Sequence, residues 1–218
     1  MPQYAGFNWE QSVPTSGNRQ PIFAFVPKFA RQAWRALARL VAPRPGRRRE
    51  LAPDQLPAWA RAGKRRHAHI QRVAALVDEW AAEMAVSREE RSRWLKAAWL
   101  HDALRDAPAT RGTTHGGAAA DRAAQDGESD RGVLDAVRYH SVGYAGWDDV
   151  RKMLYLADFL EPGRRSRRKQ RAKLAKRVPR DRDGVLREIV ALQVRARLRA
   201  GRSINPRTLE FWNSLTER

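Results

Sequence analysis

The segment RWLKAAWLHDALRD, residues 93–106, carries the pattern that decides the fold. Its side chains recur at helical spacing on one face, which is typical of a helix packed against a core: Trp94, Ala97, Ala98 and His101. The apolar stretch ends in an adjacent histidine and aspartate, His101-Asp102. Because a buried carboxylate needs a hydrogen-bond partner, an opposite charge or a metal ion, this pair marks a candidate site.

The helical period continues on both sides of this segment, and no run alternates with the period of two that a strand needs. The sequence therefore predicts an all-α fold, with helices over residues 57–63, 64–85, 88–104, 116–125, 131–141, 147–160, 182–200 and 206–216. Ser87 and Glu90 have capping-box spacing at the start of the third helix, and Gly201 follows the last turn of the seventh. The dense basic run 164–176 is expected to be a solvated loop or helix face.

The N-terminal quarter of the chain has a different character. Residues 1–27 are rich in Gly, Pro, Ser, Asn and Gln, and residues 42–57 contain four prolines and read as a stiff connector. Between them, residues 28–42 predict an amphipathic helix with a basic stripe formed by Lys28, Arg31, Arg35 and Arg39. We therefore expect an N-terminal extension with a Pro/Arg-rich linker over residues 1–55 and a helical domain over residues 56–218.

Composition narrows the function classes. The 218 residues are 42% hydrophobic, which is enough for a core, and contain no cysteine, which excludes disulfides, thiolate zinc sites, iron–sulfur clusters and cysteine nucleophiles. Lys and Arg number 43 against 24 acidic residues, a net charge of +19 that favours anionic partners. No apolar run approaches the roughly 20 residues of a membrane span, and the N-terminus lacks a signal-peptide pattern, so we expect a cytoplasmic protein.

Histidines and aspartates lie inside or at the ends of helices that are otherwise apolar. Taken singly, each is typical of an ordinary buried polar residue. Taken together they predict a metal site, because helical bundles build such sites from side chains on facing helices. The six candidate ligands are His69, His101, Asp102, His115, His140 and Asp158. Imidazole and carboxylate without thiolate favour an iron, manganese or cobalt centre over structural zinc.

His67 and His69 compete for one position in this set. Residue 69 shares a helical face with the apolar residues Val73 and Val77, whereas residue 67 aligns with Gln71 on the polar side. We therefore select His69 as the ligand.

Five motifs resemble those of the HD-domain phosphohydrolases, and most closely their YqeK-like bacterial branch. The motifs are RRHAHIQRV (65–73), AAWLHDALR (97–105), THGGAAA (114–120), LDAVRYHSVG (134–143) and YLADFLEPGR (155–164). The resemblance covers residues 60–215 and includes INPRTLEFWNSL (204–215), which is similar to the family's closing helix. One departure is the connection between His101 and His115, which is shorter than in the family and leaves no room for its extra helix.

The resemblance implies an HD-domain helical bundle that hydrolyses diadenosine tetraphosphate symmetrically into two ADP. It implies a divalent metal, as one or two ions, that activates water and neutralises phosphoryl oxygens. His69, His101, Asp102 and Asp158 would form the core of the site, and His115 and His140 would complete a second position. Asp102 and Arg105 are the expected catalytic residues, and the expected phosphate contacts are Arg105, Arg138 and Arg164.

Other functions stay open at this point. The same metal centre fits a nucleoside monophosphate, a deoxynucleoside triphosphate or a cyclic dinucleotide as substrate. A basic nucleic-acid-binding protein would use residues 47–49 and 164–176 to contact phosphates. The helix over residues 28–42 would suit an anionic membrane surface, although packing onto the main domain or onto a second subunit of a homo-oligomer is favoured.

Overall fold

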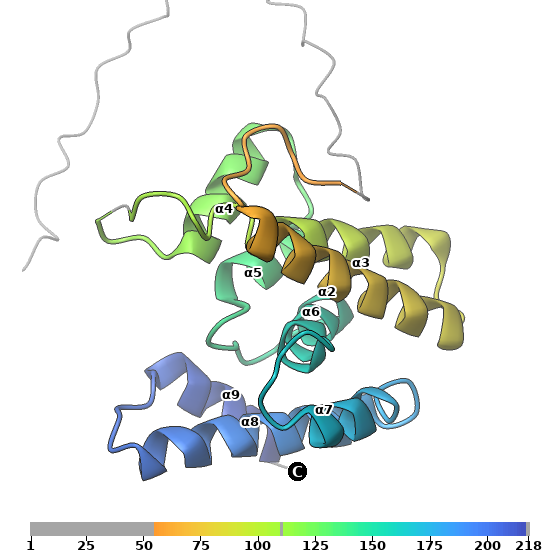
Figure 1. The fold of residues 1–218 in the computed structure, drawn as a ribbon, viewed down its shortest axis with the longest axis vertical. Coiled ribbons are helices and arrows are strands. Elements are labelled where there is room, and N and C mark those ends of the chain that lie inside the picture. The colour runs from red at the N-terminus through yellow and green to blue at the C-terminus, as the bar shows by residue number, and fades with distance from the viewer. Residues whose placement is uncertain (1–54, 110, 217–218) are drawn as a thin grey trace, which may run out of the picture. The chain divides into compact units, whose positions relative to one another are not determined.

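The structure, a computed structural model, describes residues 55–109 and 111–216 (Figure 1). Within these residues the chain forms eight helices and no strand, which confirms the all-α prediction. The helices are α2 (Lys64–Glu83), α3 (Arg88–Leu100), α4 (His115–Gln125), α5 (Arg131–Tyr139), α6 (Asp149–Leu160), α7 (Arg168–Ala175), α8 (Arg182–Arg199) and α9 (Pro206–Thr216). None of these helices is long and apolar enough to cross a membrane.

The predicted helix over residues 28–42 and the basic residues 47–49 lie outside the described residues. The domain boundary near residue 55 therefore stays a prediction.

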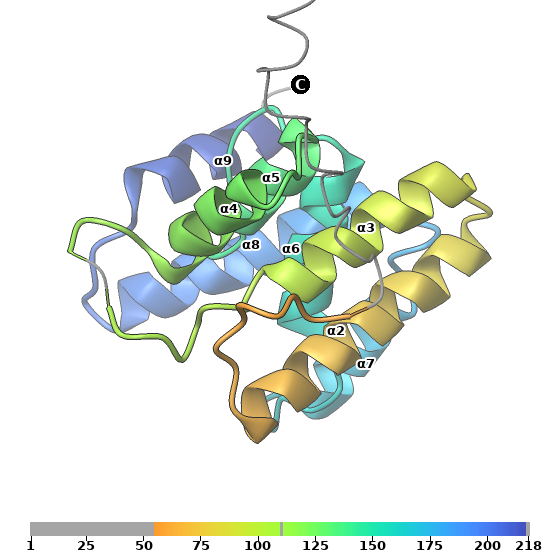
Figure 2. The same ribbon diagram turned by 90° about the horizontal axis from the view of Figure 1, so that it is seen from above.

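Helix α6 is the centre of the packing. It contacts the pair formed by α2 and α3, and also α5, α7 and α8 (Figures 1 and 2). Its sequence explains this position, because seven of its 12 residues are buried, including Met153, Leu154 and Leu156. One continuous hydrophobic core extends from Val73 in α2 to Phe211 in α9. Helix α6 thereby fixes the positions of the elements that carry the candidate ligands.

Side chains preceding the helices accept the backbone N–H groups that a first turn leaves free. Thr114 caps α4, Asp130 caps α5 and Asp148 caps α6 in this way. The expected capping box at α3 is half formed. The Ser87 side chain accepts from Glu90 N at 3.1 Å. The Glu90 carboxylate accepts from Trp94 Nε1 at 2.8 Å, and not from the backbone N–H of Ser87 as in a full capping box.

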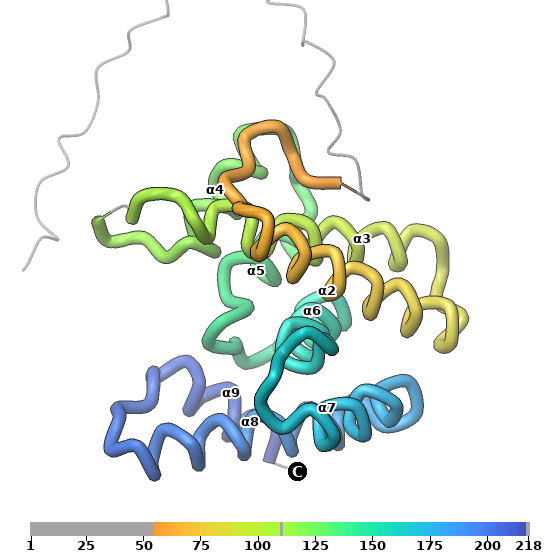
Figure 3. Tube along the Cα trace, viewed as in Figure 1, coloured from red at the N-terminus to blue at the C-terminus, as the bar shows by residue number. Residues whose placement is uncertain are grey.

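One predicted helix was wrong. Residues 57–63 form a turn and an extended segment, because the N–H of Arg61 donates to Ala103 O at 2.6 Å and is not available for a helix. The basic run 164–176, expected to be a solvated loop or helix face, contains the mostly exposed helix α7, whose Leu174 is buried. The tube trace in Figure 3 shows α7 following α6 after a short connection.

Helix α9 closes the domain through an aromatic cluster. The ring of Phe211 lies 4.6 Å from Trp147 and 5.7 Å from Tyr155, measured between centroids. The same ring rests on Gly143, whose φ of +82° and lack of space for a Cβ atom both require glycine. This contact ties the loop after α5 to the C-terminal helix.

Candidate metal centre

The candidate ligands lie close to helix ends. His101 is the C-cap residue of α3 and is followed directly by Asp102, and His140 is the C-cap residue of α5. His115 is the first residue of α4, and Asp158 lies in the last turn of α6. The fold brings these ends together with the second turn of α2, so residues far apart in the chain face one another.

The first group consists of His69, His101 and Asp158. His69 Nε2 lies 3.3 Å from His101 Nε2 and 3.2 Å from Asp158 Oδ1. His101 is fully buried, whereas the Asp158 side chain keeps 20% of its surface exposed. The three ligand atoms are close enough to bind one ion and remain within reach of solvent.

The second group consists of Asp102, His115 and His140. His115 Nε2 lies 3.2 Å from Asp102 Oδ1 and 3.1 Å from His140 Nε2. Asp102 connects the two groups, since its other oxygen, Oδ2, lies 3.7 Å from His69 Nε2 and 3.6 Å from His101 Nε2. One carboxylate therefore faces both candidate positions, one with each oxygen.

The approach of α4 to α5 depends on Gly116. A Cβ atom at this residue would lie 2.5 Å from the Val137 carbonyl oxygen and 3.1 Å from the His140 ring. The absence of a side chain lets His115, the preceding residue, reach His140. The connection from Asp102 to His115 forms turns and no helix in its described residues, and Thr114 ends it by capping α4.

Hydrogen bonds select the imidazole tautomers. His101 Nδ1 donates to Ala98 O at 2.7 Å, and His140 Nδ1 donates to Val137 O at 2.7 Å. Since a carbonyl oxygen can only accept, the proton of each neutral ring lies on Nδ1 and the lone pair of Nε2 faces the centre. His69 Nδ1 likewise faces the Glu161 carboxylate, at 3.2 Å.

This arrangement fits a divalent cation. The Nε2 lone pairs of His69 and His101 face each other at 3.3 Å, and two acceptors at that distance repel unless a proton or a metal lies between them. The carboxylate that orients His69 is the kind of outer partner that metal-binding histidines use. The donor set of nitrogen and oxygen atoms suits iron, manganese, cobalt or zinc.

The electrostatics favour ligating protonation states for His101, Asp102 and Asp158. Burial would lower the pKa of His69 and His140, but hydrogen bonds to carboxylates raise both, so these two rings must give up a proton to a bound metal. Burial lowers the pKa of His101 to about 4, so its ring is neutral at neutral pH. Burial would raise the pKa of Asp102, but hydrogen bonds to His115 and His140 hold it far below its usual range. The pKa of Asp158 is lowered against burial by its hydrogen bond to His69. Both carboxylates are therefore ionised, as metal ligands must be.

His67 belongs to neither group. Its ring packs against Trp99, with 6.2 Å between centroids, on the polar side of α2. The structure thus places His69, and not His67, beside the other five candidate ligands, as the helical-face argument predicted.

The three arginines expected to contact phosphate occupy different surroundings. Arg105 Nη1 lies 2.7 Å from His115 Nδ1, beside the second group. Arg164 forms an ion pair with Asp158, beside the first group. Arg138 instead pairs with Asp121 on α4.

Sequence reasoning assigned no role to Glu161, although its motif includes the residue. Glu161 is 2% exposed and accepts from Arg72 Nε at 2.6 Å as well as facing His69. Burial opposes ionisation, but the hydrogen bonds from His69 and Arg72 lower the pKa of Glu161 to about 2. Arg66 was also missed, and its Nη1 lies 2.5 Å from Asp102 Oδ2. For Glu161, its position directly after the apolar end of α6 was the feature of the sequence that could have indicated a role beside the ligands.

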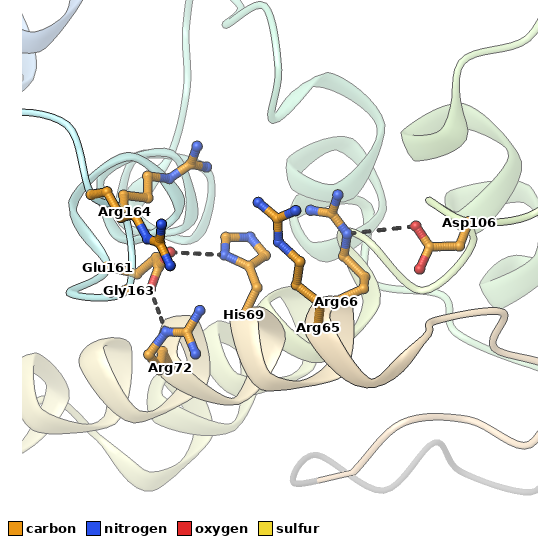
Figure 4. A pocket seen from close by; sticks show the side chains of 9 residues that line it. Arg65, Arg66, His69, Arg72, Asp106, Glu161, Gly163 and Arg164 are labelled. Carbon is orange, nitrogen blue, oxygen red and sulfur yellow. Dashed lines mark hydrogen bonds and ion pairs between the residues drawn. The ribbon is translucent and has the colours of Figure 1, made fainter.

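Two cavities open beside the ligand groups. The larger, of 980 Å³, is lined by His69, Glu161 and five arginines that include Arg66 and Arg72 (Figure 4). The smaller, of 320 Å³, is lined by His140, Asp158, Tyr155 and Gln193 among others. Arg164 lines both cavities. A bound molecule could therefore extend to either side of the candidate centre.

The family model for the HD domain matches residues 66–181, which include all six candidate ligands. The chain belongs to the HD-domain family. Its HD domain is similar to a crystal structure from Clostridium acetobutylicum described as a "predicted HD superfamily hydrolase involved in NAD metabolism". That similarity has a TM-score of 0.61 and covers 70% of this chain and 89% of the other, at 22% sequence identity, a level that shows a shared fold. The family match and the shared fold thus describe an HD domain whose histidine and aspartate groups could hold a metal.

One curated relative is the symmetrical bis(5'-nucleosyl)-tetraphosphatase of Bacillus subtilis strain 168. The two sequences are 45% identical over 38 residues, which is 17% of this chain. The match spans 20% of the length of the Bacillus protein.

Proposed function

We propose that the HD domain is a metal-dependent nucleotide phosphohydrolase and that it cleaves diadenosine tetraphosphate symmetrically into two ADP. The observation that carries the proposal is the pair of ligand groups sharing Asp102, set beside a cavity lined by five arginines. Such a cavity suits a polyanion, and such a ligand set suits the metal chemistry of phosphate hydrolysis.

In this proposal the ligand groups hold one or two divalent ions, with iron favoured and manganese or cobalt as alternatives. His69, His101 and Asp158 would hold one ion, and His115 and His140 the other, with Asp102 contributing an oxygen to each. When bound, the metal supplies Lewis acidity and activates water for attack on phosphorus. Glu161 would keep His69 oriented throughout.

The contact between Arg105 and His115 would link metal binding to phosphate binding. A guanidinium can only donate, so the contact with Nδ1 leaves the proton of the neutral His115 ring on Nε2, which faces Asp102 Oδ1. Ligation through Nε2 requires that proton to leave this atom and shift to Nδ1. Arg105 would then release the ring and become available to a phosphoryl oxygen. Asp102 as shared ligand and Arg105 as phosphate contact are therefore our proposed catalytic residues.

The two remaining proposed phosphate contacts require different movements. Arg164 lies between the two cavities and needs only to exchange Asp158 for a phosphate oxygen. Arg138 would have to leave Asp121.

Symmetric cleavage is supported by two observations. Cavities on two sides of the candidate centre suit a substrate whose reacting bond lies in its middle, with a nucleotide arm on each side. The partial match to the Bacillus symmetrical tetraphosphatase points to the same substrate.

Chromatography of the products tests this proposal. Protein supplied with Fe(II), Mn(II) or Co(II) should convert diadenosine tetraphosphate to ADP alone, and metal-free protein should not. ATP with AMP as products would refute the symmetric cut. Turnover of a nucleoside monophosphate, a deoxynucleoside triphosphate or a cyclic dinucleotide, without turnover of the tetraphosphate, would support the alternative substrates of this metal centre. Elemental analysis of protein purified without added metal identifies the ion.

A further inference from the structure

The 980 Å³ cavity carries an excess of positive charge. Five arginines line it, against the two carboxylates Asp106 and Glu161: Arg65, Arg66, Arg72, Arg164 and Arg165. In Figure 4, Arg65 and Arg66 project from the start of α2 beside His69, and Arg164 lies on the other side of His69. An anion entering this cavity would meet guanidinium groups on both sides of the candidate centre.

Three of the five arginines already have carboxylate partners. Arg66 pairs with Asp102 at 2.5 Å, Arg72 pairs with Glu161 at 2.6 Å, and Arg164 pairs with Asp158. These ion pairs hold residues of the ligand groups and of Glu161 in place. Moving Arg66 or Arg72 to a substrate would leave Asp102 or Glu161 without that partner.

Arg65 and Arg165 differ from the other three. Neither forms an ion pair or a side-chain hydrogen bond with any residue of the described ranges 55–109 and 111–216, and both are exposed. Within the part of the chain that the structure describes their donors are free, and a guanidinium binds phosphate with two parallel hydrogen bonds. Arg65 belongs to the first turn of α2, and Arg165 belongs to the connection between α6 and α7.

We propose that Arg65 and Arg165 bind the phosphates of the substrate that lie beyond the bond that is cleaved, and so select polyphosphates over phosphate monoesters. The inference rests on the proposed phosphohydrolase function and adds its selectivity to it. A monoester bound at the metal groups has no further phosphate for either arginine to bind. A polyphosphate arm that extends into the large cavity reaches one or both.

The test compares Arg65→Gln, Arg165→Gln and the double variant with Arg88→Gln as the matched control. Arg88 is an exposed arginine in the first turn of α3, and it lines neither the 980 Å³ nor the 320 Å³ cavity beside the candidate centre. For diadenosine tetraphosphate, each single variant should lose roughly tenfold in kcat/KM, the value expected for one charge-assisted contact at an exposed site. For a phosphate monoester, all variants and the control should match the wild type.

Calorimetric binding of inorganic tripolyphosphate at about physiological ionic strength is the second readout, since it needs no turnover. Binding should weaken in Arg65→Gln and Arg165→Gln and stay unchanged in Arg88→Gln. Hydrolysis of the tetraphosphate with equal kcat/KM in all variants would overturn the inference and leave the proposed function standing. Tripolyphosphate binding that depends on both arginines, without hydrolysis of any nucleotide, would support the inference and refute the proposed function. Equal weakening of binding by Arg88→Gln would overturn the inference as well, because it would show diffuse attraction to the basic surface.

Discussion

Replacing Gly116 by alanine tests whether the close approach of α4 to α5 builds the second ligand group. The new methyl group would lie 2.5 Å from the Val137 carbonyl oxygen and 3.1 Å from the His140 ring, both of which are held by neighbouring packing. Backbone cannot move aside as a flexible side chain can, so α4 must shift outward. Forcing an extra methyl group into a packed site costs about 1–3 kcal/mol.

Gly117→Ala is the matched control, because it makes the same chemical change one residue later. Its Cβ would contact only side-chain atoms, of which the nearest is the Thr113 methyl carbon at 3.2 Å. Alanine improves helix propensity by at most about 1 kcal/mol at either position. Gly117→Ala should therefore be neutral or slightly stabilising, whereas Gly116→Ala should be destabilised by a net value of roughly 1–2 kcal/mol.

Urea denaturation measures the stability difference, and elemental analysis measures the metal. Gly116→Ala should lose the more weakly held part of its metal content, since displacing α4 carries His115 away from His140 and Asp102. The two variants should share the same urea dependence of unfolding, because both keep the fold. Equal stability and equal metal content in Gly116→Ala and Gly117→Ala would refute the reasoning.

Three further predictions address the centre, the fold and the domain boundary. Asp102→Asn should abolish metal retention and hydrolysis, while His67→Ala should leave both nearly intact. Elemental analysis and product assays check this prediction. Loss of metal from the His67 variant would contradict it. The hydrogen bond from Arg93 lowers the pKa of Asp130, so the pair stabilises the fold above the ordinary aspartate pKa of about 4 and this stabilisation is lost as the pH falls through the lowered value. Asp130→Asn should thus lower the free energy of unfolding by roughly 0.5–1 kcal/mol near neutral pH. In urea titrations at several pH values, the stability of this variant should fall less steeply below about pH 4 than that of the wild type. An equally steep fall in both proteins would contradict a stabilising role of the pair. Residues 56–218 expressed alone should fold and keep activity, as circular dichroism and the product assay would show, and failure to fold would place part of the core in the first 55 residues.

Several local features follow from the sequence alone. Helical periodicity predicts the all-α fold because the apolar face of each helix must be buried, whatever it packs against. The same reasoning separates His69 from His67, since residues on one helix have fixed relative directions. Thr114 and Asp130 cap helices through bonds that span three residues, and Gly201 follows α8 with a φ of +60°.

Local patterns failed where backbone partners are distant in the chain. Residues 57–63 have helical spacing, but the N–H of Arg61 donates to Ala103, a residue that periodicity cannot connect to it. The basic run around α7 is largely exposed, as expected for a solvated helix face, and the sequence did not indicate that Leu174 alone is buried in the core.

Only the tertiary structure decided how the candidate site is divided. The family resemblance implied that Asp102 shares the first position with His69, His101 and Asp158, whereas the structure groups Asp102 with His115 and His140. Asp102 turns one oxygen to His69 and the other to His115, an arrangement that depends on the meeting of α2, the end of α3 and the start of α4. Likewise, Arg138 pairs with Asp121 while Arg65 keeps its donors free of partners in the described residues. Charge and spacing cannot distinguish such arginines, because the partner of a long side chain is set by distances through space and not along the chain.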